Sequence, residues 1–127
     1  MTKSSFRTPL GRVRFLGPAR QGAVEAARQR LTAVALAPLA IGFVWLVLSL
    51  LPKDYNAARA KMGQPLNTLV ILLFVLVGVY HMQIGMRSVI IDYLGGRARE
   101  WGLIVNALVA GALGVVCVYA ALRISFV

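Results

Sequence analysis

The sequence predicts an all-α membrane protein with three transmembrane helices and a short N-terminal interfacial helix. Three apolar stretches carry this prediction, at residues 31–51, 66–86 and 103–122, and none of them contains Asp, Glu, Lys or Arg. Each is long enough to cross a hydrocarbon core, which takes about 20 helical residues. At 127 residues, 59% of them apolar, the chain has room for one domain, more apolar than a soluble domain of this size.

The first 17 residues differ from the rest of the chain, because they mix Gly, Ser, Thr and Arg without periodicity. They predict a flexible basic arm, residues 1–17, that is attracted to acidic lipid or to a soluble partner. These positions do not resemble a signal peptide, so we expect the N-terminus to be retained. Pro18 suits the first turn of a helix, and the segment after it predicts an interfacial helix that continues into the first span. We expect residues 18–127 to form a single three-helix membrane domain.

The first span covers about residues 31–51 and is interrupted by a proline. Pro38 lies inside it and predicts a kink, which a helical bundle tolerates because neighbouring groups satisfy the freed carbonyl. Pro52 marks the end of the span. The loop at 53–64 is polar with a short Ala-rich stretch, and Pro65 fits the first turn of the next helix.

The second and third spans cover about residues 66–94 and 103–124. The loop between them, residues 95–102, is short, so these two helices are predicted to be antiparallel neighbours. The third span also has a surface of small residues suited to close helix packing, formed by Gly102, Ala110, Gly111 and Gly114.

The basic residues predict the orientation in the membrane. Nine precede the first span or lie between the second and third: Lys3, Arg7, Arg12, Arg14, Arg20, Arg28, Arg30, Arg97 and Arg99. Four lie on the opposite side: Lys53, Arg59, Lys61 and Arg123. The positive-inside rule places the richer side in the cytoplasm, so the N-terminus is predicted to be cytoplasmic and the C-terminus periplasmic.

Composition also excludes several functions. The net charge of +10 does not indicate nucleic-acid binding, because most basic residues flank membrane spans and are not interleaved with aromatic residues. Cys117 is the only cysteine, which excludes disulfides, zinc clusters and iron–sulfur ligation within the chain. We interpret Cys117 as a small apolar residue that fills space in the third span.

One face of the second span carries polar residues together with glycines, which have no side chain. At 100° per residue, His81, Gly85, Ser88 and Asp92 fall within about 60° of one another, and Gly78 borders the same stripe. The rise of the helix places Asp92 roughly 16 Å from His81 along the axis. His81 is therefore deep in the membrane, Asp92 is near the inner surface, and the two glycines leave room for a flat group beside His81.

His81, the only histidine, has two interpretations. A histidine of this kind can simply be hydrogen-bonded across a helix interface. In lipid, however, an ionisable residue is costly and usually marks a pathway or a cofactor, and a neutral imidazole beside glycines suits axial ligation of haem iron. One histidine supplies one axial ligand, so a bis-histidine haem needs a second helix from a partner subunit.

Asp92 and Tyr93 stand where the second helix meets the cytoplasmic interface. Tyrosine is common in interfacial belts, and an aspartate at the end of a span can simply face water. The functional alternative is a quinone site, in which the tyrosine hydroxyl donates a hydrogen bond to a quinone carbonyl and the carboxylate relays protons. Arg87 lies on a different face of the helix and is expected to be an interfacial anchor.

Some of these residues also form a motif: His81, Ile84, Gly85, Met86, Val89, Asp92 and Tyr93. This run resembles the second-helix signature of the hydrophobic membrane anchor subunit of succinate dehydrogenase, respiratory complex II. At the entrance of the first span, Arg30, Thr32 and Ala33 resemble the Arg-x-Thr-Ala sequence of that family. The size of the chain and the three-span layout agree with the family as well.

The resemblance implies the membrane anchor subunit of a succinate:ubiquinone oxidoreductase in a bacterial inner membrane. Its partners would be a cytochrome b subunit, with which it shares haem b, and an iron–sulfur subunit and a flavoprotein subunit on the cytoplasmic side. Succinate is oxidised in those soluble subunits, so this chain would not be catalytic alone.

The resemblance also implies roles for single residues. His81 would be the axial ligand of the haem iron, and Gly78 and Gly85 would allow close approach of the porphyrin. Tyr93 would donate a hydrogen bond to ubiquinone, with Asp92 near that site. Arg30 would lie near the haem propionates or the quinone entrance.

Three alternatives remain open from the sequence. The chain could be a fumarate-reductase-type or haem-free quinone anchor, with the same layout. It could be a small transporter subunit in which His81 and Asp92 relay protons, although the third span offers few polar partners beyond Asn106. It could also be a purely structural anchor, in which replacement of His81 changes neither a haem spectrum nor quinone reduction.

Overall fold

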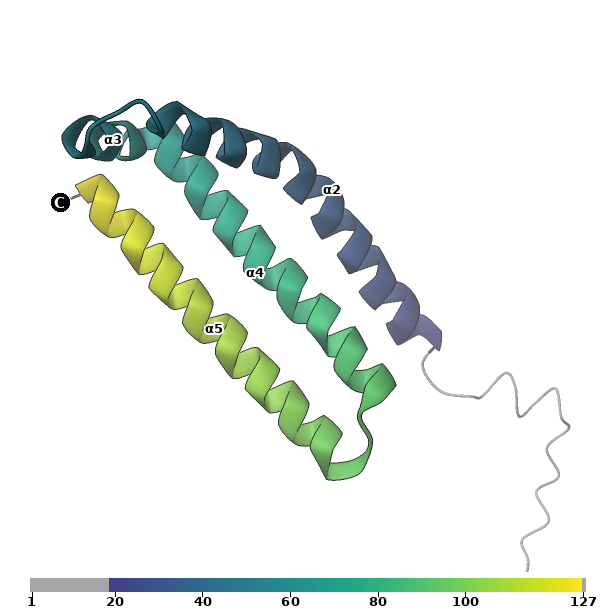
Figure 1. Cartoon of the computed structure of the whole chain (residues 1–127). Helices are drawn as coiled ribbons and strands as arrows, with labels where there is room; N and C mark the ends of the chain where they lie inside the picture. Colours follow the sequence, from purple (N-terminus) through teal and green to yellow (C-terminus); the bar gives the residue numbers. More distant parts are fainter. Residues whose placement is uncertain (1–18, 127) are drawn as a thin grey trace, which may run out of the picture.

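The computed structural model describes residues 19–126, and all regular structure among them is helical. The helices are α2 (Ala19–Leu50), α3 (Tyr55–Met62), α4 (Pro65–Tyr93) and α5 (Gly96–Phe126). Each long helix runs antiparallel to the long helix before it, and α4 lies between α2 and α5 (Figure 1). The chain therefore forms an open layer of helices with two seams, α2/α4 and α4/α5.

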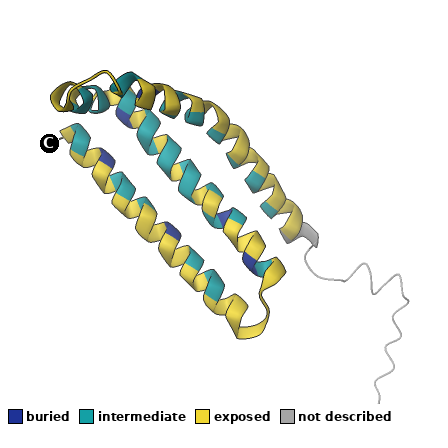
Figure 2. Ribbon diagram, viewed as in Figure 1, coloured by how far each residue is buried: buried dark blue, intermediate teal, exposed yellow. Residues whose placement is uncertain are grey.

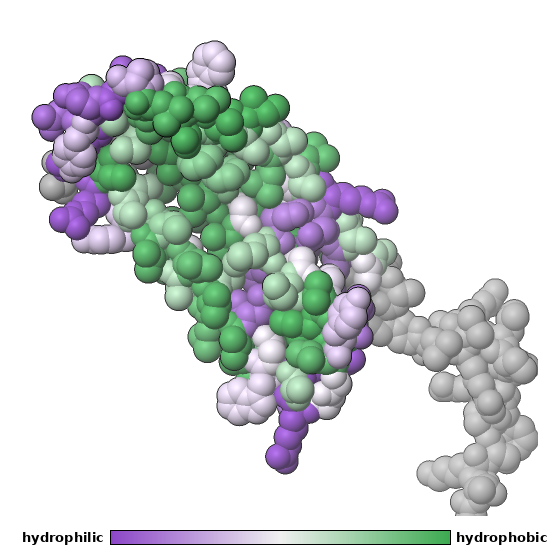
Figure 3. Space-filling model, viewed as in Figure 1, coloured by the Kyte–Doolittle hydropathy of each residue, from purple (hydrophilic) through white to green (hydrophobic). Residues whose placement is uncertain are grey.

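The prediction of three membrane spans is confirmed. Within the described residues α2, α4 and α5 are each long and apolar enough to cross a membrane, while α3 is short. Apolar residues cover much of the surface of the long helices, and hydrophilic residues gather toward the two ends of the layer (Figure 3). The few buried residues lie along the seams (Figure 2). Most apolar side chains thus face outward, as expected for helices surrounded by lipid or by other membrane chains.

α2 extends well beyond the predicted first span. It begins at Ala19 and continues without a break to Leu50 with Pro38 inside it, and it bends along its length (Figure 1). The segment predicted as a short interfacial helix does continue into the first span, since both are part of α2, and its place at the membrane surface stays a prediction. The basic arm, residues 1–17, and Pro18 lie outside the described residues.

The predicted loop at 53–64 contains a helix that the sequence analysis did not assign. Asp54 caps the start of α3, because its Oδ1 atom accepts a hydrogen bond from the backbone nitrogen of Ala57 at 3.1 Å. At the other end, Thr68 and Asn67 of α4 donate side-chain hydrogen bonds to the carbonyl oxygens of Met62 and Lys61, at 2.9 and 2.7 Å. The first turn of α4 therefore stabilises the end of α3.

The predicted loop at 95–102 is also wrong in extent, since α5 already begins at Gly96. Gly96 has a φ of 54°, a left-handed conformation that glycine adopts without strain, and it lets the chain reverse within two residues. Arg99 then satisfies the end of α4, because its Nη2 and Nε atoms donate to the carbonyl oxygens of Ile91 and Leu94, each at 2.9 Å. The predicted antiparallel packing of α4 and α5 is confirmed.

Small residues of α5 allow α4 and α5 to pack closely against each other. Ala110 is buried, and a Cβ atom on Gly102 would lie 3.2 Å from the side chains of Ile90 and Leu94. Asn106 adds one polar contact, a 2.9 Å hydrogen bond from its Nδ2 atom to the carbonyl oxygen of Gln83. The predicted packing surface is thus confirmed at Gly102 and Ala110, whereas an added Cβ atom on Gly111 would have no neighbour within 4 Å.

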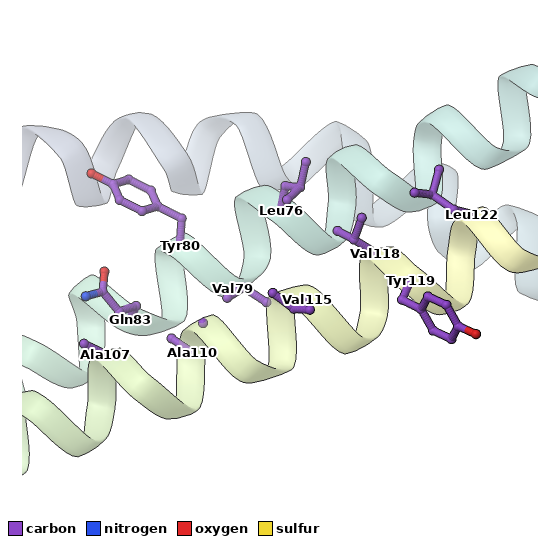
Figure 4. Close-up of a pocket in the computed structure, with 12 residues that line it drawn as sticks. Leu76, Val79, Tyr80, Gln83, Ala107, Ala110, Val115, Val118, Tyr119 and Leu122 are labelled. Carbon is purple, nitrogen blue, oxygen red and sulfur yellow. The ribbon is translucent and has the colours of Figure 1, made fainter.

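An apolar groove of about 640 Å³ runs along one side of the α4/α5 seam (Figure 4). Gln83 lies beside Ala107 at one end of it, and Tyr119 points outward from α5. None of the residues predicted to bind a cofactor or a quinone lines this groove.

Candidate functional site

The predicted polar stripe of α4 lies on the α2/α4 seam. His81 is half-buried there, in the half of the layer that contains the N-terminal part of α2 and the α4–α5 turn. Gly78 and Gly85 flank it on the same seam, because Leu36 and Gln29 of α2 are their respective neighbours. The stripe thus faces another helix of the same chain.

His81 has polar neighbours at both ring nitrogens. The Oγ1 atom of Thr32 lies 2.7 Å from Nδ1, and the Nε2 atom of Gln29 lies 3.4 Å from the imidazole Nε2. The Thr32 hydroxyl is also within 2.9 Å of the carbonyl oxygen of Arg28 and 3.1 Å of that of Gln29. The short contact therefore engages Nδ1, and Nε2 has only a long, weak one.

Gln29 is held in this site without full hydrogen bonding. Its Oε1 atom is buried and has no hydrogen-bond partner among the described residues, an arrangement that costs about 1–3 kcal/mol for a neutral polar group. A Cβ atom on Gly85 would lie 3.1 Å from the Gln29 Nε2 atom. The space that the sequence assigned to a flat group beside Gly85 is thus taken by the Gln29 amide.

An ion pair joins the two helices closer to the N-terminal end of α2. The Nε atom of Arg87 lies 3.2 Å from the Oε1 atom of Glu25, and the side chains are 47% and 34% exposed. Arg87, predicted as an interfacial anchor, therefore also links α4 to α2. Partly exposed pairs of this kind contribute about 0.2–1 kcal/mol.

The remaining predicted residues lie apart from His81. Asp92 is exposed, and Tyr93 is the last residue of α4 with 84% of its surface exposed. Ser88 donates a 3.2 Å hydrogen bond to the Ile84 carbonyl oxygen within its own helix. Arg30 is exposed and, two residues before Thr32, occupies the face of α2 that is turned away from α4. The structure brings none of these four side chains to the imidazole.

The other half of the α2/α4 seam is apolar. Phe43 and Phe74 stack with ring centroids 4.5 Å apart and an interplanar angle of 12°, and Leu46 is buried. Within the described part of this seam, side-chain hydrogen bonds resume only near the end that holds α3, at Ser49, Asn67 and Thr68. The polar contacts of His81 therefore do not continue across the layer.

On the α2 side of this site, the sequence analysis named Thr32 only as part of a family motif and missed Glu25 and Gln29. Glu25, Gln29 and Thr32 recur at intervals of four and three residues, so they share one helix face. That spacing was visible in the sequence, but it did not reveal that the polar face of α2 meets the polar face of α4.

The chain matches the family described as succinate dehydrogenase/fumarate reductase transmembrane subunit over residues 4–121. It belongs to this family. The match covers all three long helices up to Ala121, including the α2/α4 seam with His81.

Individual relatives agree with this assignment. The chain is 31% identical to the succinate dehydrogenase hydrophobic membrane anchor subunit of Paracoccus denitrificans, over 93% of this chain and 92% of that protein. It is 26% identical to the subunit of the same name from Rickettsia bellii, over 87% and 89% of the two chains. A third relative of that name, from Rickettsia conorii, is 28% identical over 70% and 71%. No solved structure matches the chain.

Proposed function

We propose that this anchor subunit belongs to a succinate:ubiquinone oxidoreductase and that His81 supplies one of two axial ligands to haem b. The observation that carries the proposal is the pair of contacts at the imidazole. Nδ1 has a 2.7 Å contact with the Thr32 hydroxyl, and Nε2 has only a 3.4 Å contact with the Gln29 amide. An imidazole engaged through one nitrogen and nearly free at the other is the usual arrangement of a histidine that ligates a metal.

The donor set fits haem better than a non-haem metal. Among the described residues no three His, Cys, Asp or Glu side chains come together to hold an ion, so this chain can offer a metal a single imidazole. Haem needs no more, because the porphyrin supplies four ligands and a partner subunit can supply the second axial one. The fit requires the Gln29 side chain to leave Nε2, and its unpaired Oε1 atom makes that movement inexpensive.

When bound, haem b would supply a one-electron carrier within the membrane. The residues of this chain would orient the imidazole through Thr32, and the stacked rings of Phe43 and Phe74 would provide an apolar neighbour along the seam that disfavours water. Gly78 and Gly85 keep the flanks of the imidazole free of side chains of α4 itself. The shared haem makes a cytochrome b subunit the direct partner in the membrane.

For the quinone, we assign Tyr93 and Asp92. Both are exposed at the end of α4 beside the α4–α5 turn, where they are free to contact a quinone or a partner subunit. The Tyr93 hydroxyl would donate a hydrogen bond to a ubiquinone carbonyl, and the Asp92 carboxylate would relay protons. Arg30 would act near the haem propionates or the quinone entrance, toward a neighbouring subunit, because it faces away from α4.

The iron–sulfur and flavoprotein subunits would dock on the side of the membrane that holds this end of α4. The predicted orientation makes that side cytoplasmic in a bacterial inner membrane, with the C-terminus periplasmic. The first turns of α2 would lie at the membrane surface there, and the basic arm before them would contact acidic lipid or the soluble subunits.

The apolar half of the α2/α4 seam disfavours the proton-relay alternative. From His81 to Asn67 lie 14 residues of helix, or roughly 21 Å along its axis, without a polar contact between α2 and α4 in the described chain. A relay through His81 and Asp92 would stop at this barrier. The fumarate-reductase alternative has the same layout and differs in the direction of the reaction.

Co-purification tests the proposal. The chain is extracted from its native membrane in mild detergent through a tag without histidine, the accompanying subunits are identified, and a reduced-minus-oxidised spectrum is recorded. We expect a flavoprotein, an iron–sulfur protein, a second membrane subunit and a b-type haem spectrum. Recovery of the subunits without haem would establish the haem-free anchor, and flux in liposomes from this chain alone would establish the transporter.

A further inference from the structure

We propose that Thr32 is a positioning residue for His81: its hydroxyl oxygen accepts a hydrogen bond from the Nδ1–H group and thereby fixes the tautomer that leaves the Nε2 lone pair free. The hydrogen bonding of the chain itself carries this inference, and its consequence for haem rests on the proposed function above. The contact joins two helices, since Thr32 lies on α2 and His81 on α4.

The proton count of the Thr32 hydroxyl assigns the direction of the bond. The hydroxyl has one proton and two acceptor lone pairs, and the carbonyl oxygen of Arg28, at 2.9 Å, is an acceptor that can only receive a proton. When Thr32 donates there, its 2.7 Å contact with the imidazole is a hydrogen bond only if His81 donates from Nδ1. Nε2 is then unprotonated, and the Gln29 amide nitrogen, 3.4 Å away, faces it as a donor.

The opposite tautomer fits the same atoms less well. If Thr32 donated to Nδ1, the proton of His81 would be on Nε2 and would face the Gln29 amide nitrogen, which is itself a donor. Rotation of the Gln29 amide would relieve this conflict and give its unpaired Oε1 atom a donor, but only through a long contact, and the shorter bond from Thr32 to the α2 backbone would be given up. The tautomer with the proton on Nδ1 retains both contacts of Thr32 and the Gln29 contact as they stand, and it leaves only Gln29 Oε1 unpaired.

Two consequences follow for a metal at Nε2. Donation from Nδ1 makes the imidazole a more basic ligand at its other nitrogen, and it limits rotation of the ring. Because Thr32 is neutral, the effect on basicity is moderate compared with that of a carboxylate at the same place. Thr32 therefore tunes the ligand through His81 without touching the haem.

The tautomer can be measured without haem, because His81 is the only histidine in the chain. The full chain is produced with ¹⁵N-labelled histidine and a tag without histidine, and the ring nitrogen shifts are recorded in detergent. We expect the Nδ1-protonated form in the wild type and in Thr32→Ser, and a loss of that preference in Thr32→Val. Thr68→Val is the matched control, since Thr68 donates to the Met62 carbonyl oxygen far from His81. A wild-type chain with its proton on Nε2 would overturn the inference.

The second measurement uses the whole complex. In Thr32→Val we expect haem to be retained, with a midpoint potential shifted to a more positive value and an altered low-spin EPR signal, because a less basic and more freely rotating imidazole favours ferrous iron. Thr32→Ser should restore both properties, and Thr68→Val should change neither. Equal potentials in all three variants would refute the positioning role. A haem spectrum that survives in His81→Leu would instead refute the ligand assignment, and the tautomer measurement would still stand.

Discussion

The two seams of α4 have the same antiparallel geometry and different chemistry. The α2/α4 seam brings Thr32 and Gln29 to a half-buried imidazole. The α4/α5 seam is built from small residues, with one hydrogen bond from Asn106 to a backbone carbonyl. In a membrane, where lipid is as apolar as leucine, close packing is enough to hold two helices together. Polar side chains that meet one another across the helices therefore mark the α2/α4 seam as the candidate site, whereas the α4/α5 seam has only the bond from Asn106 to a main-chain oxygen and serves packing.

The largest expected effect comes from exchanging the polar group of each seam for leucine. His81→Leu should abolish or strongly shift the b-haem spectrum of the complex, because the proposed axial ligand is removed. Asn106→Leu, the matched control on the α4/α5 seam, should leave that spectrum unchanged, since it loses only a bond to a main-chain oxygen. Reduced-minus-oxidised spectra of the two purified complexes give the comparison. Loss of the spectrum in both variants would show that haem binding depends on both seams and not on the α2/α4 seam alone.

Removal of the Tyr93 hydroxyl should have the next largest effect. Tyr93→Phe would delete the proposed hydrogen bond to quinone, of about 0.5–1.5 kcal/mol, which corresponds to a loss of up to about tenfold in quinone reduction. Succinate oxidation measured with a soluble dye should remain largely intact, because it bypasses the membrane site. Tyr80→Phe, on the same helix but in the α4/α5 groove, serves as the control and should leave both rates unchanged. Equal loss in both assays would place the defect outside the quinone site.

On the packing seam, a side chain added at Gly102 should destabilise the helices without affecting the imidazole. A Cβ atom there would already lie 3.2 Å from the side chains of Ile90 and Leu94, so Gly102→Val should cost about 1–3 kcal/mol of stability. Gly111→Val carries the same β-branched side chain, but at Gly111 no atom of the described chain lies within 4 Å of an added Cβ. Thermal unfolding of the two variants in detergent should therefore differ, and equal melting temperatures would contradict the close seam.

The smallest effect should come from the ion pair at the end of the α2/α4 seam. A double-mutant cycle of Glu25→Gln and Arg87→Gln should give a coupling of about 0.2–1 kcal/mol, because both side chains are partly exposed. The coupling should weaken in high salt, since screening acts on exposed charges. Chemical unfolding in detergent at low and high ionic strength measures it. A larger, salt-independent coupling would mean that the pair is buried by another subunit or by lipid.

Most errors in predicting the fold from sequence concerned the connections. The uncharged runs correctly marked the spans, because hydrocarbon thickness sets their length. The Ala-rich loop forms α3 because residues of α4, Asn67 and Thr68, bind its last carbonyl oxygens. The turn after Tyr93 is shorter than expected because Arg99 completes the hydrogen bonding at the end of α4. These hydrogen bonds join residues of different segments, and a hydropathy pattern does not predict such contacts.

For the site, the sequence alone identified the polar stripe of α4 and its family, since His81, Gly85, Asp92 and Tyr93 follow from helical spacing and a recognisable motif. Only the tertiary structure decided what faces the stripe. The rotation of α2 about its axis places Thr32 and Gln29 on the imidazole and turns Arg30 away, and that rotation depends on packing along the whole seam, including the stack of Phe43 on Phe74. Periodicity fixes which residues share a face of one helix, but packing between helices determines which faces meet.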